Sequence, residues 1–199
     1  MKKITFRTEE DSLGKVKVPK TALYGAQTQR AIDNFKISGD VFPPDFIESL
    51  AALKAACALA NYKAKLMPAT TAKAISSCAL DIHKNIDKYY DQFPIDLYQT
   101  GSGTSTNMNM NEVLATTVSN KLKKKVHPND DINKSQSSND VIPTTINICS
   151  VLLALELNDA LDYFTMKLID KEFEVKDIIK SGRTHLMDAV PLSLSYEIE

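Results

Sequence analysis

The chain has few cysteines and almost no net charge. Only three cysteines occur among 199 residues, and 24 basic residues nearly balance 25 acidic ones, for a net charge of −1. Three widely spaced cysteines make no disulfide scaffold, so we expect Cys57, Cys78 and Cys149 to be reduced packing residues. A nearly neutral chain also lacks the electrostatic attraction that nucleic acid or an anionic membrane requires. These absences favour a small molecule or a protein as the partner.

Long apolar runs and strand patterns are also missing. The N-terminus lacks the apolar segment of a secretory signal, and no window approaches the roughly 18 apolar residues of a membrane span. We therefore expect an unexported, cytoplasmic protein. No alternation typical of strands stands out, and there are no repeats, so the predicted fold class is all-α.

Apolar residues instead recur at steps of three and four, the period of an amphipathic helix. Residues 1–41 are punctuated by glycine and proline and are predicted to form an extended arm with brief turns. The pattern predicts helices over 45–67, 70–90, about 109 onwards and 139–172, with another starting at Pro191. The 139–172 helix would be about 50 Å long. A helix so long and apolar requires partner helices to cover it.

Three polar loops each precede a predicted helix, at 100–112, 127–140 and 181–191. If these helices bundle, their N-termini can converge on one cavity, and helix N-termini with hydroxyl and amide side chains suit carboxylates. The candidate side chains are Ser102, Thr104, Asn107, Ser137, Ser138, Asn139, Thr184 and His185. Taken singly, each loop is more typical of a surface turn than of a binding site. His127, Asp130, Asp131 and Asp140 make a weak ligand set, so no metal is expected.

The same loops resemble a known family. "TGSGTSTNMNMNEV", "VHPNDDINKSQSSNDVIPT" and "SGRTHLMDAVPLS" resemble signature blocks of the class II fumarases, in the fumarase/aspartase superfamily, and "LYGAQTQRAIDNF" is similar to their N-terminal arm. The resemblance runs collinearly over essentially the whole chain. It implies a homotetramer with a long central helical bundle that hydrates fumarate to L-malate in the tricarboxylic acid cycle without a cofactor. It also implies an N-terminal lyase domain over 1–138 and the start of the central bundle over 139–199.

The resemblance assigns roles residue by residue. It implies that the substrate carboxylates are bound by Ser102, Gly103, Thr104, Ser137, Ser138, Asn139 and Thr184. His185 matches the catalytic histidine, which positions water and relays a proton. His127, Pro128, Asn129 and Asp130 match an accessory dicarboxylate site. The chemistry explains these residue types: loss of the C3 proton of malate creates a doubly charged carboxylate, which preorganised donors stabilise, and loss of hydroxide requires an acid.

The chain also departs from the family. Family members are roughly twice as long, and their loop of the type "SSxMPxKxN", which carries the favoured base, has no counterpart here. We therefore expect this chain to be an incomplete and inactive part of the enzyme. Met187 stands where glutamine is usual, and Lys124 where arginine is common. Two alternatives remain. One is an aspartate ammonia-lyase, but His185 disfavours it because aspartases tend to carry glutamine at this position. The other is a non-catalytic remnant that associates with other subunits.

Overall fold

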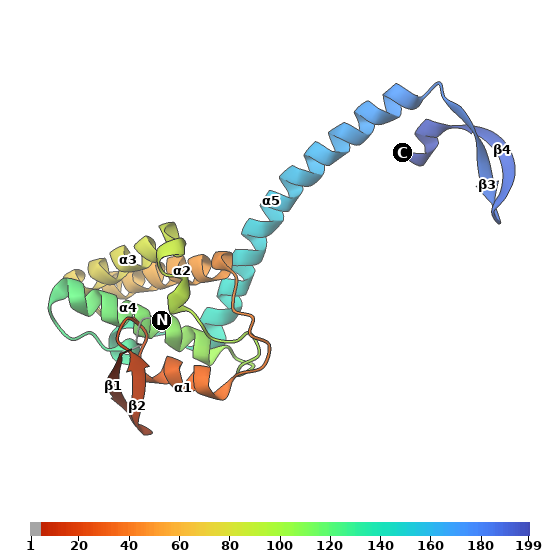
Figure 1. Cartoon of the computed structure of the whole chain (residues 1–199). Helices are drawn as coiled ribbons and strands as arrows, with labels where there is room; N and C mark the ends of the chain where they lie inside the picture. Colours follow the sequence, from red (N-terminus) through yellow and green to blue (C-terminus); the bar gives the residue numbers. More distant parts are fainter. Residues whose placement is uncertain (1–4) are drawn as a thin grey trace. The chain divides into compact units, whose positions relative to one another are not determined.

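The computed structural model describes residues 5–199 as a mainly helical chain (Figure 1). Its longer helices are α1 (Ala26–Asn34), α2 (Pro44–Lys63), α3 (Ala69–Lys84), α4 (Thr104–Leu122) and α5 (Ser138–Val175). Short helical turns cover Ile86–Lys88, Tyr90–Gln92, Pro128–Ile132 and Leu194–Glu197. The mainly helical prediction is confirmed. Helix α3 ends six residues earlier than predicted, and α4 begins at Thr104 instead of near residue 109.

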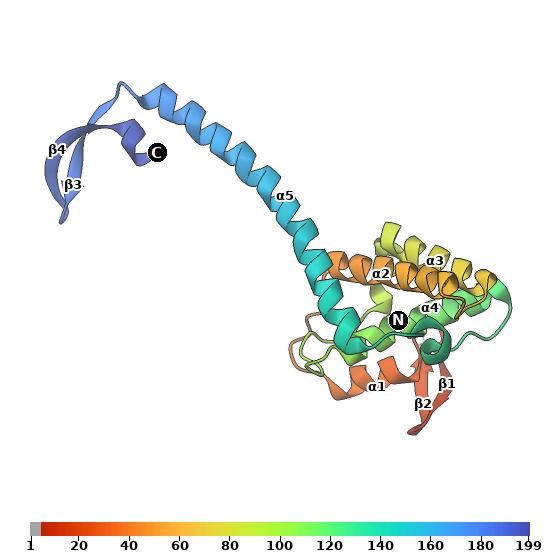
Figure 2. The ribbon, with the colours of Figure 1, turned by 180° about the vertical axis from the view of Figure 1, so that it is seen from behind.

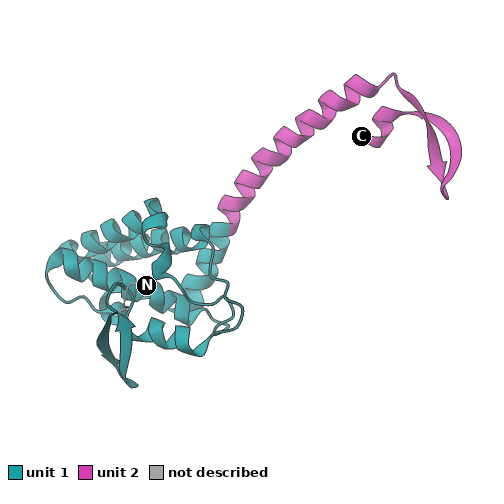
Figure 3. Cartoon of the chain, viewed as in Figure 1, with its two compact units in different colours: residues 1–149 teal, residues 150–199 magenta. Residues whose placement is uncertain are grey.

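The chain divides into two compact units, residues 1–149 and 150–199 (Figure 3). The division falls within α5, whose first turns belong to the first unit. The predicted domain boundary between residues 138 and 139 remains a prediction.

The core of the first unit lies between α2, α3 and α4, which lie side by side in both views (Figures 1 and 2). Each contributes apolar side chains at helical spacing that are at most 1% exposed: Ile47, Leu50, Ile75, Ile82, Val113, Leu114 and Val118. Buried alanines in α2 and α3 let these helices approach closely. The three cysteines are free, with Cys78 and Cys149 buried and Cys57 half-buried, as expected of packing residues.

The N-terminal arm is more ordered than predicted. Strands β1 (Phe6–Asp11) and β2 (Gly14–Pro19) form an antiparallel hairpin, with Phe6 opposite Pro19, and α1 follows. The prediction of an arm with brief turns was therefore wrong in detail. "KVKVP" alternates charged and apolar residues, which is the sign of a half-buried strand.

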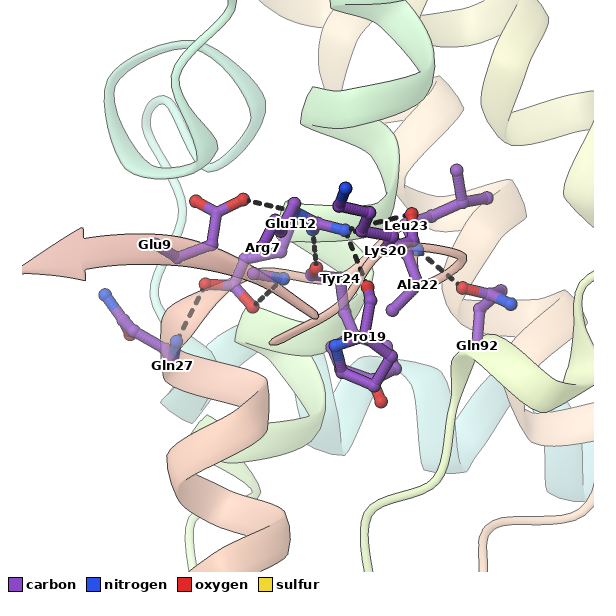
Figure 4. A network of polar contacts seen from close by, with 11 residues as sticks. Arg7, Glu9, Pro19, Lys20, Ala22, Leu23, Tyr24, Gln27, Gln92 and Glu112 are labelled. Carbon is purple, nitrogen blue, oxygen red and sulfur yellow. Dashed lines mark hydrogen bonds and ion pairs between the residues drawn. The ribbon is translucent and has the colours of Figure 1, made fainter. Parts of the chain in front are cut away.

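Two polar anchors, the half-buried Arg7 and the buried Glu112, hold this arm (Figure 4). The Arg7 guanidinium donates to the carbonyls of Ala22 (2.7 Å) and Tyr24 (2.6 Å). The Glu112 carboxylate accepts the backbone N–H groups of Gly25 (2.8 Å), Gln27 (3.0 Å) and Thr28 (3.0 Å). Since the first N–H groups of a helix have no partner within it, Glu112 caps α1 from α4.

The second unit contains a second hairpin. Strand β3 (Ile179–Thr184) pairs antiparallel with β4 (Met187–Ser193), with a shift of register between Ser181 and Arg183. The predicted helix starting at Pro191 was wrong, because Pro191 lies in β4 opposite Ser181. Proline has no backbone N–H to donate to a regular ladder. Within strands it is therefore found at edges or beside such an irregularity.

Helix α5 contains an 18-residue window with a mean hydropathy of 1.5. By length and composition alone, this helix could cross a membrane. The expectation that no segment approaches this length and composition was wrong. One such helix is weak evidence for a membrane span, because core helices of soluble proteins have the same composition.

Candidate active site

The structure brings two of the three predicted loops together. Thr104 begins α4 and Ser138 begins α5, and their hydroxyl oxygens lie 3.1 Å apart. The Ser102 hydroxyl lies 3.0 Å from that of Thr104. These three hydroxyls, which we call the hydroxyl cluster, connect the N-termini of two helices. Helix N-termini carry unpaired N–H groups and partial positive charge, so an anion is favoured there.

Gly103 makes this approach of the two helices possible. It caps α4 with a φ of +66°, in the left-handed region that side chains rarely adopt. A Cβ atom built on it would lie 2.9 Å from Cγ2 of Ile142. Both the backbone conformation and the space therefore require glycine beside α5.

Ser137 and Asn139 flank the hydroxyl cluster and are exposed. The Ser137 hydroxyl accepts the backbone N–H of Asn139 (3.3 Å), and the Ser137 carbonyl accepts that of Val141 (2.9 Å). Ser137 thus starts α5, while the Asn139 side chain stays accessible to a ligand. The one acidic residue in the first turn of α5 is Asp140.

Asn107 was predicted to face the cavity, but its side chain is buried and bonded to another residue. It is 2% exposed, and its amide nitrogen donates to Oδ1 of Asn133 (3.1 Å). Among the described residues its own oxygen has no hydrogen-bond partner. Asn107 therefore joins the first turn of α4 to the segment that precedes α5.

Lys54 is a buried residue that the sequence analysis missed. Its side chain extends from α2 and donates to Oε1 of Gln136 (2.9 Å) and Oδ1 of Asn133 (3.1 Å). It is only 1% exposed, and burial lowers the pKa of its amine to about 7. A lysine at an otherwise apolar helical position, "LAALKAACALA", is the signal that identifies it.

The predicted accessory residues lie together at another place in the first unit. His127 caps the short helix Pro128–Ile132, and its Nδ1 accepts the Asp130 N–H (3.2 Å). His127, Pro128 and Asn129 line a cavity of about 550 Å³. The same cavity is lined by Lys125 and by the carboxylates of Glu9, Glu10, Asp11 and Glu112.

Most of these carboxylates already have partners. Asp11 pairs with Arg30 and Glu9 with Arg7, and Glu112 caps α1. The side-chain hydrogen bond from Arg30 is the main cause that lowers the pKa of Asp11. The cavity nevertheless has no excess of basic groups, so its own charge gives little attraction for a dicarboxylate.

Thr184 and His185 lie in the second unit, where the β3–β4 turn exposes both. His185 and Leu186 are the two central residues of this turn, with φ of 51° and 63°. Two successive left-handed residues make a type I′ turn, which usually carries asparagine and glycine. The turn therefore holds His185 at its tip at a conformational cost. No group of three or more histidine, cysteine, aspartate or glutamate side chains that could hold a metal occurs within residues 5–199.

A mainly helical fold with hydroxyl and amide side chains gathered at helix N-termini is suited to binding a carboxylate. The chain belongs to the lyase family, whose model, described as "Lyase", matches residues 14–199.

Similar proteins narrow this class. The class II fumarate hydratase of Xylella fastidiosa is 48% identical over 194 residues, covering 96% of this chain and 40% of the relative. That of Bacillus subtilis is 46% identical, covering 97% of this chain and 43% of the relative. The resemblance to class II fumarases is therefore confirmed. The chain spans about two fifths of the length of these relatives.

Solved structures agree. The structure of the "fumarate lyase:delta crystallin" from Brucella melitensis matches with a TM-score of 0.91 at 39% identity, over 98% of this chain and 46% of that one. The class II fumarase from Schistosoma mansoni matches with a TM-score of 0.89 at 37% identity, over 98% of this chain and 42% of that one. Similarity to these enzymes supports a soluble protein.

Proposed function

We propose that this chain forms the N-terminal part of a class II fumarate hydratase, which reversibly hydrates fumarate to L-malate. The observation that carries the proposal is the hydroxyl cluster, in which Thr104 and Ser138 join the N-termini of α4 and α5 at 3.1 Å. A fumarate carboxylate is planar and accepts several hydrogen bonds. Neutral donors bind it without an ion pair that would have to be broken on release.

The proposed carboxylate clamp in the first unit consists of the hydroxyl cluster with Gly103, Ser137 and Asn139. The resemblance adds Thr184 as a further ligand of the carboxylate. When the C3 proton leaves malate, the adjacent carboxylate takes up a second negative charge. Donors already oriented toward it stabilise this charge more than they stabilise the ground state, and this difference lowers the barrier. The resemblance places the base that removes the proton in a loop outside these residues, so we expect this chain to bind but not to turn over substrate alone.

His185 is the proposed acid at the other carbon. It holds the water at C2 and relays the proton as hydroxide leaves. The strained turn supports this role, because left-handed residues without glycine are often retained where a side chain must be held in place.

Further proposals follow from the resemblance. We place the enzyme in the cytoplasm, in the tricarboxylic acid cycle, as a homotetramer that needs no cofactor. His127, Pro128, Asn129 and Asp130 form its accessory dicarboxylate site. The carboxylates that line that cavity outnumber its basic groups, so we expect weak binding of a dicarboxylate there.

The test uses the full-length protein and the absorbance of fumarate. His185→Asn is expected to lower the hydration rate about 10²- to 10⁴-fold, the usual effect of removing an acid or base. His83→Asn is the matched control, because His83 lies in α3, outside the proposed site, and should leave the rate unchanged. Near-normal turnover of the His185 variant would refute the role of His185. Efficient formation of aspartate when ammonia is supplied would instead identify an ammonia-lyase.

A further inference from the structure

Lys54 carries a buried positive charge that no residue neutralises in the described part of the chain. Its ammonium donates to two neutral amide oxygens, those of Asn133 and Gln136, and no carboxylate lies within ion-pair distance among residues 5–199. A lysine is almost never fully buried without a charged partner, because desolvation of the ammonium costs free energy. An apolar residue at this position of α2 would avoid that cost, so the core does not require lysine.

The two amides that Lys54 binds lie directly before the clamp. Gln136 is the residue before Ser137, and the Gln136 amide nitrogen donates to the carbonyls of Ile132 (2.9 Å) and Lys134 (3.2 Å). Asn133 Nδ2 donates to the Gln136 carbonyl (3.2 Å). The segment 132–136 is therefore tied by its own side chains into one conformation, and Lys54 attaches that conformation to α2.

The same network reaches the other half of the clamp. Asn133 Oδ1 accepts from Lys54 and also from Nδ2 of Asn107, in the first turn of α4. Thr104 begins α4, and Ser138 begins α5. One oxygen thus joins α2, the start of α4 and the segment before α5.

We propose that Lys54 is a positioning residue for the carboxylate clamp. Through Asn133 and Gln136 it holds the starts of α4 and α5 at the spacing that the hydroxyl cluster needs. This role rests on the proposed function for its substrate, but the network itself does not.

The experiment compares Lys54→Met and Gln136→Met in the full-length protein. Lys54→Met removes the charge and both hydrogen bonds. Gln136→Met leaves the charge but removes one acceptor of Lys54 together with the bonds from the Gln136 amide nitrogen to Ile132 and Lys134. Lys63→Met is the matched control, since Lys63 lies on the same helix and is exposed. Hydrogen exchange of the amides of residues 133–139 reports positioning, and the KM for fumarate with the affinity for succinate reports the clamp.

We expect Lys54→Met to weaken succinate binding and raise KM about 10- to 100-fold, the usual effect of losing hydrogen bonds to a charged group. Exchange should become faster at residues 133–139 and stay unchanged in α3. Gln136→Met should have the same effects at smaller size. If Lys54→Met fails to fold, Gln136→Met is compared with Gln136→Glu, which also loses the amide donors but keeps an oxygen for Lys54; a larger effect in Gln136→Met is the expected result, and equal effects would overturn the proposal.

The proposal is overturned if folded Lys54→Met retains wild-type exchange at 133–139 and wild-type succinate affinity. It is also overturned if exchange rises equally in α2 and α3 while Gln136→Met changes nothing, because Lys54 would then only stabilise the core. A wild-type protein that binds succinate but does not hydrate fumarate would refute the proposed reaction and leave the positioning role to be decided by the exchange data.

Discussion

At the scale of single residues, the contact of Gly25 with Glu112 fixes the start of α1. A Cβ atom on Gly25 would lie 2.9 Å from Oε1 and 3.1 Å from Cδ of Glu112. The carboxylate cannot retreat without losing its bonds to the three α1 amides, so a methyl group there must displace either the cap or the arm.

Gly25→Ala should therefore destabilise the first unit by about 1–3 kcal/mol, the usual cost of overpacking. The measurement is the urea midpoint of unfolding. Gly101→Ala is the control, since nothing lies within 4 Å of its added Cβ. Equal midpoints for the two variants would show that Glu112 adapts and that the cap is not rigid.

The titration of Lys54 predicts a pH dependence of stability. Burial lowers its pKa to about 7 in the folded chain from an ordinary value of 10.5. Between these values the unfolded chain binds the proton more strongly, so the free energy of unfolding must rise with pH from about 7 upward. The cost of the buried charge is fully present below pH 7.

Urea unfolding at pH 7 and pH 8.5 tests this rise. The wild type should gain stability over that interval, and Lys54→Met should gain less. Restricting the interval keeps the nearby Cys57 thiol, whose pKa is raised by burial, largely protonated in the folded state. Lys63→Met should retain the wild-type rise, and an identical rise in Lys54→Met would contradict the assignment.

At the scale of elements, the β3–β4 hairpin combines an unfavourable turn with a tight strand contact. Leu186 has a φ of 63° and is 98% exposed. Within this chain, no packing of its side chain therefore offsets the cost of its left-handed backbone conformation. Gly182 is the opposite case, because an added Cβ would lie 2.9 Å from the backbone oxygen of Val190.

Leu186→Gly should stabilise the hairpin by about 1 kcal/mol, since glycine adopts the left-handed region without penalty. Gly182→Ala should destabilise it. Hydrogen exchange of the β3 amides measures both effects. Slower exchange in Leu186→Gly and faster exchange in Gly182→Ala is the expected pair, and the reverse order would exclude the type I′ turn.

At the scale of the whole molecule, α5 exposes a long apolar surface. Leu152, Leu157, Leu161, Phe164 and Phe173 are each at least 50% exposed. Soluble monomers rarely expose contiguous apolar patches of such extent, which usually mark an interface. The proposed occupants are bundle helices of the same enzyme, from the rest of the protein or from further copies.

The purified 199-residue chain should therefore self-associate, and it should not hydrate fumarate. Sedimentation velocity over a range of concentrations and fumarate absorbance measure the two properties. Replacing Leu157, Leu161 and Phe164 by lysine should give a smaller species. A wild-type monomer that hydrates fumarate would refute both the uncovered bundle helix and the placement of the base outside these residues.

Much of the helical framework and the chemistry of the site is encoded locally. Helix periodicity placed α2 and α5 within a few residues, because burial on one face repeats every three to four positions. Short polar residues ahead of helices identified Ser102, Thr104 and Ser138, since helix starts need side-chain or ligand partners whatever surrounds them. The long motifs also indicated the family, which the relatives confirm.

Other features depend on groups far apart in the chain. Lys54 is 79 residues from Asn133, and Glu112 is 87 residues from Gly25; no local period records such pairs, so the cap and the buried cation required tertiary structure. The hairpins were missed because their strands are short and mostly exposed, and pairing rather than burial stabilises them. Which loops meet is likewise a property of packing: the fold brings Thr104 to Ser138, while sequence shows only that each begins a helix. Local burial patterns and helix-end chemistry act over a few residues, and contacts between distant segments exist only once the chain has folded.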